Sequence, residues 1–141
     1  GSQKVIEIHG TPQIHRCRTC GWTMSFDEAA KIVRAGGIPR CAKCGSILKP
    51  EITFFGENLP MQALREARAE ATAADLMLVL GSSLLVYPAA SLPQYTLEHG
   101  GQIVIVNNMP THLDSRAILR FDELADVFEY LEAQLDGGWL E

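Results

Sequence analysis

Four cysteines in two short-spaced pairs, Cys17-x-x-Cys20 and Cys41-x-x-Cys44, constrain this chain more than any other feature of its sequence. Two such pairs on two tight turns can converge on one tetrahedral metal ion, and Zn²⁺ accepts four thiolates at about 2.3 Å without any other ligand. A glycine directly follows each pair, as a chain that folds back tightly around a metal requires. Because a closed four-sulfur site leaves no open position for a substrate, we predict that these cysteines bind a structural zinc ion.

Two other interpretations of the cysteines remain open at this level. The pairs could form two disulfides, or one Cys-x-x-Cys could be a redox dithiol. A redox site would need only one pair, and nothing in the sequence suggests an oxidising compartment.

Length and composition restrict the classes of protein that need to be considered. The 141 residues suit one domain, or one domain with a small metal-stabilised insert, and a hydrophobic fraction of 47% is ample for a core. A net charge of −5 argues against a nucleic-acid surface, and no polybasic segment suggests a membrane partner. The longest apolar run, Leu76–Leu80, is too short to span a bilayer, and the N-terminus shows no signal-peptide pattern. We therefore expect a soluble protein of the cytoplasm.

Three segments follow one another along the chain. Residues 3–13 contain an alternating stretch, Lys4–Ile8, that predicts a short strand leading to His9. Residues 14–49 form the zinc module, and a capping-box signal at Ser25 and Glu28 predicts a helix between its two cysteine pairs. Residues 50–136 form the third segment.

From Pro60 onward the pattern alternates between helix and strand. The expected elements are a helix to Ala73, a strand Leu76–Leu80, a helix from Pro88 to Gly100, a strand Ile103–Val106, a strand Ala117–Phe121 and a final helix capped by Asp122. The first two strands lack polar alternation, as in a parallel sheet that is buried on both faces. The fold class is therefore α/β, with half of a doubly wound Rossmann-like parallel sheet and a small four-cysteine zinc-ribbon module.

A half-sheet of this kind leaves strand edges and helix faces uncovered, including parts of Leu76–Leu80 and Ile103–Val106. No Gly-x-Gly-x-x-Gly follows any strand, so the phosphate-binding half of a dinucleotide fold is missing. We expect a partner to cover the exposed surface, either the missing N-terminal half or a second copy in a homo-oligomer.

Several polar residues stand where strands are expected to end. His9 could act as a general base near neutral pH, although its position alone fits a half-buried histidine bonded to a backbone carbonyl better. Gly81-Ser82-Ser83 and Asn107 follow buried strands, at the edge where open α/β sheets bind ligands. Ordinary turn chemistry is the alternative for both groups, because Gly, Ser and Asn are common turn formers.

A further segment, Phe54-Phe55-Gly56-Glu57, places aromatic surface beside a flexible glycine. It could line an apolar tunnel and offer backbone groups to an extended peptide. Burial in a core is the alternative.

Taken in chain order, six motifs resemble the sirtuins, the NAD-dependent protein deacylases of the silent-information-regulator family, and most closely the bacterial-type members. The resemblance extends from Val5 to about Leu135. Its motifs are Ile6-Glu7-Ile8-His9-Gly10, the two cysteine pairs, the segment Lys49–Glu57, Gly81-Ser82-Ser83-Leu84, Tyr87-Pro88-Ala89-Ala90 and Val106-Asn107.

The resemblance implies a role for each matching position. His9 matches the catalytic base, which takes a proton from the nicotinamide ribose after the acyl oxygen has displaced nicotinamide. The four cysteines match the structural zinc ligands. Positions that match the acyl-lysine tunnel and the strand that pairs with substrate backbone are Thr53, Phe55, Gly56, Val86 and Tyr87. Positions that match the adenosine half of the NAD site are Gly81, Ser82, Ser83, Asn107, Leu124 and Ala125.

This sequence departs from the family pattern in three respects. The Gly-Ala-Gly segment that cradles the pyrophosphate and the Gln-Asn-Ile-Asp motif upstream of the histidine are not in it, and Thr53 stands where valine is common. The resemblance therefore implies the C-terminal part of an NAD-dependent lysine deacylase, inactive and weak in NAD binding by itself, with a slightly altered acyl preference. A zinc-stabilised binding or assembly module that works without catalysis is the alternative.

Overall fold

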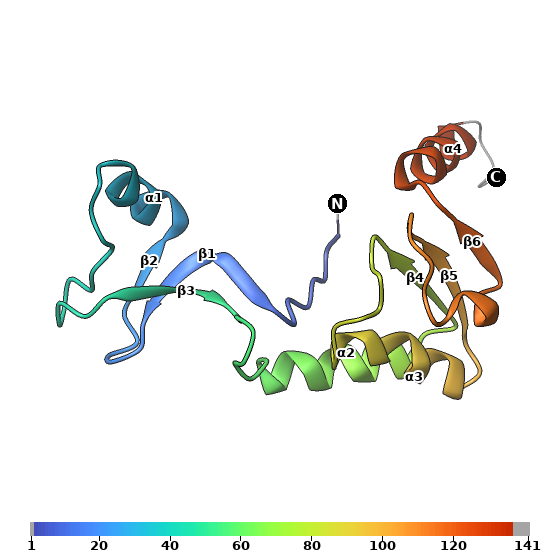
Figure 1. The fold of residues 1–141 in the computed structure, drawn as a ribbon, viewed down its shortest axis with the longest axis horizontal. Coiled ribbons are helices and arrows are strands. Elements are labelled where there is room, and N and C mark those ends of the chain that lie inside the picture. The colour runs from blue at the N-terminus through green and yellow to red at the C-terminus, as the bar shows by residue number, and fades with distance from the viewer. Residues whose placement is uncertain (1, 137–141) are drawn as a thin grey trace. The chain divides into compact units, whose positions relative to one another are not determined.

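The computed structural model describes residues 2–136 of the chain, which divides into two compact units, Gly1–Leu64 and Arg65–Glu141. Figure 1 shows the elements of each unit. Among the described residues, no helix combines the length and the apolar character that a membrane crossing requires.

The first unit is built on a small antiparallel sheet with strand order β2-β1-β3. Its strands are β1 (Gly10–Cys17), β2 (Thr23–Ser25) and β3 (Leu48–Ile52), and helix α1 (Phe26–Arg34) lies between β2 and β3 in sequence. The expected capping box is confirmed, because the Ser25 hydroxyl accepts from the Glu28 N–H at 3.3 Å while the Glu28 carboxylate accepts from the Ser25 N–H at 3.0 Å.

The strand expected at Lys4–Ile8 is not formed, and this prediction is wrong. The chain turns at this point, with the Gly10 N–H donating to the Glu7 carbonyl at 2.9 Å, and β1 begins only at Gly10. An alternating segment forms a strand only where a neighbouring strand supplies hydrogen-bond partners, and β3 supplies them from Gly10 onward. His9 therefore lies in the turn before a strand rather than at the end of one.

The second unit contains a three-stranded parallel sheet with order β4-β5-β6. Its elements are β4 (Leu76–Leu80), α3 (Leu92–Glu98), β5 (Gln102–Val106), β6 (Leu119–Phe121) and α4 (Leu124–Asp136), with short 3₁₀ turns at Ala89–Ser91 and Asp114–Arg116. Helix α2 (Met61–Ala73) precedes β4, and the boundary between the units falls within it. The predicted half of a doubly wound parallel sheet is thus confirmed.

The boundary between the second and third sequence segments needs a correction. We placed it after residue 49, but β3 extends to Ile52 and pairs with β1 along the small sheet. Antiparallel pairing holds residues 50–52 in the first unit, whose limit is Leu64.

One face of the parallel sheet carries the core of the second unit. Odd-numbered side chains of β4 and β5, such as Val79, Ile103 and Ile105, pack with Leu84 and Leu113 and are at most 6% exposed. Helices α2 and α3 are joined by the buried Thr96 hydroxyl, which donates to the Ala71 carbonyl at 2.6 Å.

The other face of the sheet is open at β4 and β6, contrary to the expectation of burial on both faces. Leu76, Leu78 and Leu80 are 41–51% exposed, and Leu119 and Phe121 are 54% and 40% exposed. Strand β5 stays buried because it is the central strand. The exposure expected from the missing half of the sheet is therefore confirmed for Leu76–Leu80 and wrong for Ile103–Val106. We call these five exposed side chains the open face.

Candidate metal centre and cofactor cleft

Two turns of nearly identical geometry present the four cysteines. In each turn the glycine N–H donates to the carbonyl of the first cysteine at 2.9 Å, from Gly21 to Cys17 and from Gly45 to Cys41. Both glycines adopt positive φ, 75° and 73°, which side chains with a Cβ rarely adopt. The glycines that suggested tight turns in the sequence thus close both of them.

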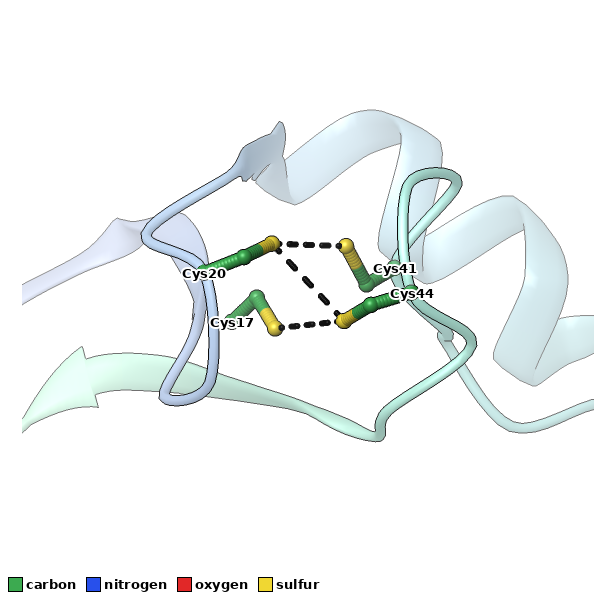
Figure 2. Close-up of side chains that lie close together, drawn as sticks. All are labelled: Cys17, Cys20, Cys41 and Cys44. Atoms are coloured by element: carbon green, nitrogen blue, oxygen red, sulfur yellow. Dashed lines mark hydrogen bonds between the residues drawn. The ribbon is translucent and has the colours of Figure 1, made fainter.

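The four sulfur atoms converge on one point (Figure 2), all within 4.8 Å of one another. The Sγ–Sγ distances from Cys17 to Cys44 and from Cys20 to Cys41 are both 3.4 Å, and that from Cys20 to Cys44 is 3.7 Å. Four sulfurs at about 2.3 Å from one ion lie roughly 3.8 Å apart, so only a small adjustment of the sulfur positions is needed to bind Zn²⁺. All four are free thiols, which disagrees with the disulfide interpretation.

Electrostatics within the cluster also favour a cation. The Cys20 backbone N–H lowers the pKa of the Cys17 thiol to about 6. The Trp22 N–H lowers the pKa of Cys20, but the neighbouring sulfurs, that of Cys41 above all, raise it to about 12. The pKa of Cys44 is lowered as well, chiefly by the Ser46 hydroxyl. Ionisation of Cys20 is opposed by the neighbouring sulfurs, so a divalent cation would be needed to hold all four cysteines as thiolates.

The backbone around His9 is tied to the segment that resembles the acyl-lysine tunnel. The His9 side chain is exposed, and its carbonyl accepts from the Thr53 N–H at 2.9 Å. The neighbouring Gly10 adopts φ 74°, and a Cβ built on it would lie 1.9 Å from the Glu51 carbonyl oxygen. Only glycine lets β1 approach β3 closely enough to place His9 beside Thr53.

A Lys49–Glu57 ion pair closes the loop that follows Thr53. The Lys49 Nζ donates to Glu57 at 2.6 Å and to the Ile52 carbonyl at 2.9 Å, and lies 4.5 Å from the centre of the Phe54 ring. The Glu57 carboxylate also accepts from the Phe54 N–H at 2.9 Å. Phe55, at 95% exposed, is presented outward by this loop rather than buried in a core.

A polar cavity of about 700 Å³ lies beside this loop in the first unit. Thr53 and Gly56 line it, together with Arg18 and Glu57. Val86 and Tyr87, the other two positions that resemble substrate contacts, belong to the second unit and are 50% and 62% exposed.

Four of the six positions that resemble cofactor contacts meet at one cavity of about 240 Å³ in the second unit. Gly81 follows β4, Asn107 follows β5, and Leu124 and Ala125 begin α4. Segments that end parallel strands meet at the same edge of a sheet, and this brings together residues up to 44 positions apart. We call this space the strand-end cavity.

Ser82 and Ser83 are half-buried and stand outside the residues that line the strand-end cavity. The Ser82 hydroxyl instead accepts from the Leu84 N–H at 3.3 Å, as the turn-chemistry alternative predicts. Asp122 and Glu123 line the cavity but were not among the predicted residues. They follow β6, so the strand-end rule applied to the third strand would have found them.

Taken together, these features define an α/β protein in which a four-cysteine zinc module accompanies half of a Rossmann-like sheet. Residues 1–88 match the family model described as "Sir2 family", and the chain belongs to the Sir2 family.

Curated relatives and solved structures agree with this assignment. The NAD-dependent protein deacetylase of Thermotoga maritima is 44% identical over 138 residues, 98% of this chain and 55% of that protein. The NAD-dependent protein deacetylase 1 of Pyrobaculum aerophilum is 45% identical over 114 residues, 81% of this chain and 44% of that protein. The chain thus spans about half the length of the curated relatives it matches.

Several solved structures match the whole chain, two peptide complexes among them. Sir2 with a p53 peptide and NAD⁺ superposes with a TM-score of 0.87 at 42% identity and covers 100% of this chain and 58% of that one. Sir2Tm bound to a propionylated peptide gives the same score and identity and covers 100% and 59%.

Proposed function

We propose that this chain is the part of an NAD-dependent protein lysine deacylase that holds the zinc module, the catalytic base and the adenosine side of the NAD cleft. The observation that carries the proposal is the meeting of Gly81, Asn107, Leu124 and Ala125 at one cavity. The reaction is acyl-lysine, NAD and water to lysine, nicotinamide and O-acyl-ADP-ribose.

The zinc ion has a structural role in this proposal, because all four positions of the tetrahedron are filled by cysteine. Cys17 ends β1 and Cys41 precedes β3, so the ion joins the two strands whose other ends carry His9 and Thr53. NAD, when bound, supplies the ADP-ribosyl group that takes up the acyl oxygen as nicotinamide leaves.

His9 would accept the proton of a ribose hydroxyl, and its exposed position leaves the imidazole accessible to such a group. Thr53, Phe55 and Gly56 would surround the acyl-lysine, and Val86 and Tyr87 would pair with the substrate backbone. Acylated peptides bound to the solved relatives support an acyl-lysine substrate.

The test is reconstitution of turnover. The chain is mixed with a polypeptide that supplies the remaining part of a Sir2 relative, and release of nicotinamide from NAD is measured with an acetylated peptide. We expect His9→Ala to abolish the release. His99→Ala is the matched control, because His99 is an exposed helix-end histidine bonded to the Tyr95 carbonyl. Turnover that survives His9→Ala would contradict the proposed base.

A non-catalytic binding or assembly module is the second candidate, and the open face favours it. Below this face lies an apolar cavity of about 810 Å³ between the sheet and α4, lined by Leu78, Leu80, Leu119, Phe121 and Phe128. A surface of this kind normally has a partner, either the rest of the Sir2 protein or a second copy. Failure of every reconstitution, with zinc bound and a stable oligomer formed, would select this candidate.

We also propose that the protein works in the cytoplasm. Four free thiols gathered at a metal site suit a reducing compartment, where such thiols stay available to zinc. Fractionation of cells of the source organism, with immunodetection of the protein, tests this, and recovery from an extracytoplasmic fraction would overturn it.

A further inference from the structure

The side chain of Arg120 joins three segments of the second unit, two of which line the strand-end cavity. Arg120 lies in β6, and each of its three guanidinium nitrogens donates to a different acceptor. The Nε donates to Asp114 at 3.0 Å, the Nη1 to Asp122 at 2.6 Å and the Nη2 to the Asn107 carbonyl at 3.0 Å. The three acceptors lie at the start, in the middle and at the end of the 107–122 stretch.

Two of the three acceptors belong to residues that line the cavity, Asn107 and Asp122. Asn107 is 7% exposed, and its backbone N–H donates to the Phe121 carbonyl at 3.0 Å. Two residues of β6 therefore hold the Asn107 backbone: the Phe121 carbonyl binds its N–H, and the Arg120 guanidinium binds its carbonyl. The Asn107 side-chain amide donates to the Met109 carbonyl at 2.8 Å, so Asn107 also holds the start of the following loop.

The third acceptor, Asp114, anchors the far end of that loop. Its carboxylate accepts from the Thr111 hydroxyl at 2.5 Å as well as from Arg120. The Thr111 contact above all holds the pKa of Asp114 below its ordinary range, so Asp114 stays ionised opposite Arg120 at neutral pH.

We propose that Arg120 is a positioning residue for the adenosine side of the cofactor cleft, acting through the Asn107 carbonyl and the Asp122 carboxylate. The inference rests on the proposed function, because it assigns the strand-end cavity to the adenosine half of NAD. All three guanidinium nitrogens donate to protein acceptors, so the role of Arg120 is to hold the residues around the cavity rather than to contact the ligand.

The planar, forked shape of the guanidinium is what allows Arg120 to bind three acceptors at once. An arginine directs five N–H donors along fixed directions, whereas a lysine ammonium is a single point with three donors. Lysine at this position keeps the charge near Asp114 and Asp122 but cannot reach the Asn107 carbonyl at the same time. Charge balance alone would be rescued by lysine, and positioning would not.

The experiment measures binding of ADP-ribose to the 141-residue chain by NMR titration, at a temperature where each variant is folded. We expect Arg120→Gln and Arg120→Lys each to weaken binding by about tenfold, as loss of a supporting partner behind a ligand-binding group typically does. Arg68→Met is the matched control, because Arg68 lies in the same unit and stacks 4.4 Å over the Tyr95 ring, outside the cavity. It should leave the dissociation constant unchanged.

The results of the titration distinguish an error in the role of Arg120 from an error in the proposed cofactor site. Equal affinity in wild type and Arg120→Gln overturns the positioning role while leaving the proposed cofactor site intact, even if the variant melts earlier. Full affinity in Arg120→Lys shows that charge alone suffices and overturns the fork argument. A wild-type chain that shows no shift at Gly81, Asn107 and Leu124 under saturating ADP-ribose overturns the adenosine site and this inference with it.

Discussion

Replacement of Gly10 by alanine tests whether the close approach of β1 to β3 sets the position of His9. A Cβ at this position would lie 1.9 Å from the Glu51 carbonyl oxygen and 3.0 Å from its carbon. The nearest distance is more than 1 Å shorter than real Cβ contacts, and both partners are backbone atoms that no rotamer change can move. The start of the β1–β3 ladder, where Gly10 pairs with Ile52, must therefore separate.

The expected cost has two parts. A residue with a Cβ at φ 74° costs about 1–2 kcal/mol. Separation of the strands at this end removes one or two hydrogen bonds, including that from the Thr53 N–H to the His9 carbonyl, each worth about 1 kcal/mol. We therefore expect Gly10→Ala to lower the free energy of unfolding by about 2–4 kcal/mol.

Gly36→Ala is the matched control. Gly36 follows α1 with φ 79°, and a Cβ there would meet nothing within 4 Å. It should cost only the conformational part, about 1–2 kcal/mol. The pair of variants therefore separates the steric contact from the backbone conformation.

Urea unfolding followed by circular dichroism measures the global cost, and hydrogen exchange of the Thr53 amide measures the local one. We expect Thr53 to lose protection in Gly10→Ala and to keep it in Gly36→Ala. Equal unfolding free energies for the two variants, with Thr53 protected in both, would refute the argument that only glycine fits between β1 and Glu51.

Three further predictions concern the metal, pH and assembly. Metal analysis should find about one zinc per chain, and chelation should unfold the first unit, since structural zinc contributes its binding free energy to folding; a metal-free chain with unchanged circular dichroism and melting temperature would contradict this. The Arg16 contact holds the pKa of Glu51 below its ordinary value, so its contribution to stability is complete above about pH 4.3 and is lost as the pH falls through the lowered value. Glu51→Gln should therefore reduce the fall in melting temperature between neutral and acidic pH. An unchanged fall would show that the Arg16–Glu51 pair contributes nothing to stability. The open face should drive formation of a homo-oligomer, detected by light scattering at high micromolar concentration and weakened by Leu78→Glu; a compact wild-type monomer would exclude it.

Local patterns predicted the order of the elements of the second unit and the limits of some of them, although α3 and β6 are shorter than expected. The Leu76–Leu80 strand has the predicted limits, and the helix that ends at Ala73 begins one residue after Pro60. Proline at a helix start and glycine at turns act through their own backbone geometry, so a single sequence suffices to interpret them. The same holds for the capping box of α1.

Pairing between distant segments was harder to predict. The alternation of Lys4–Ile8 suggested a strand, yet the partner β3 meets the chain only from Gly10 onward. The apolar run of β4 suggested burial on both faces, because such a run is the same whether a sheet is covered on one face or on both; only the missing half of the sheet indicated exposure. Both properties depend on neighbours that are far away in sequence.

The sequence by itself predicted the metal centre, since the spacing of the four cysteines and the two glycines favours two similar tight turns around one ion, and the convergence of the sulfurs agrees with it. Only the tertiary structure decided which strand-end residues share a cavity. Gly81, Asn107 and Leu124 meet because three parallel strands end at one edge, whereas Ser82 turns to the Leu84 N–H instead. The contacts of Arg120 could likewise not be predicted from the sequence. Its guanidinium reaches the Asn107 carbonyl only because β6 pairs with β5. Ligand spacing and turn geometry are local properties of the chain, but a cavity exists only where the packing of the whole unit brings its walls together.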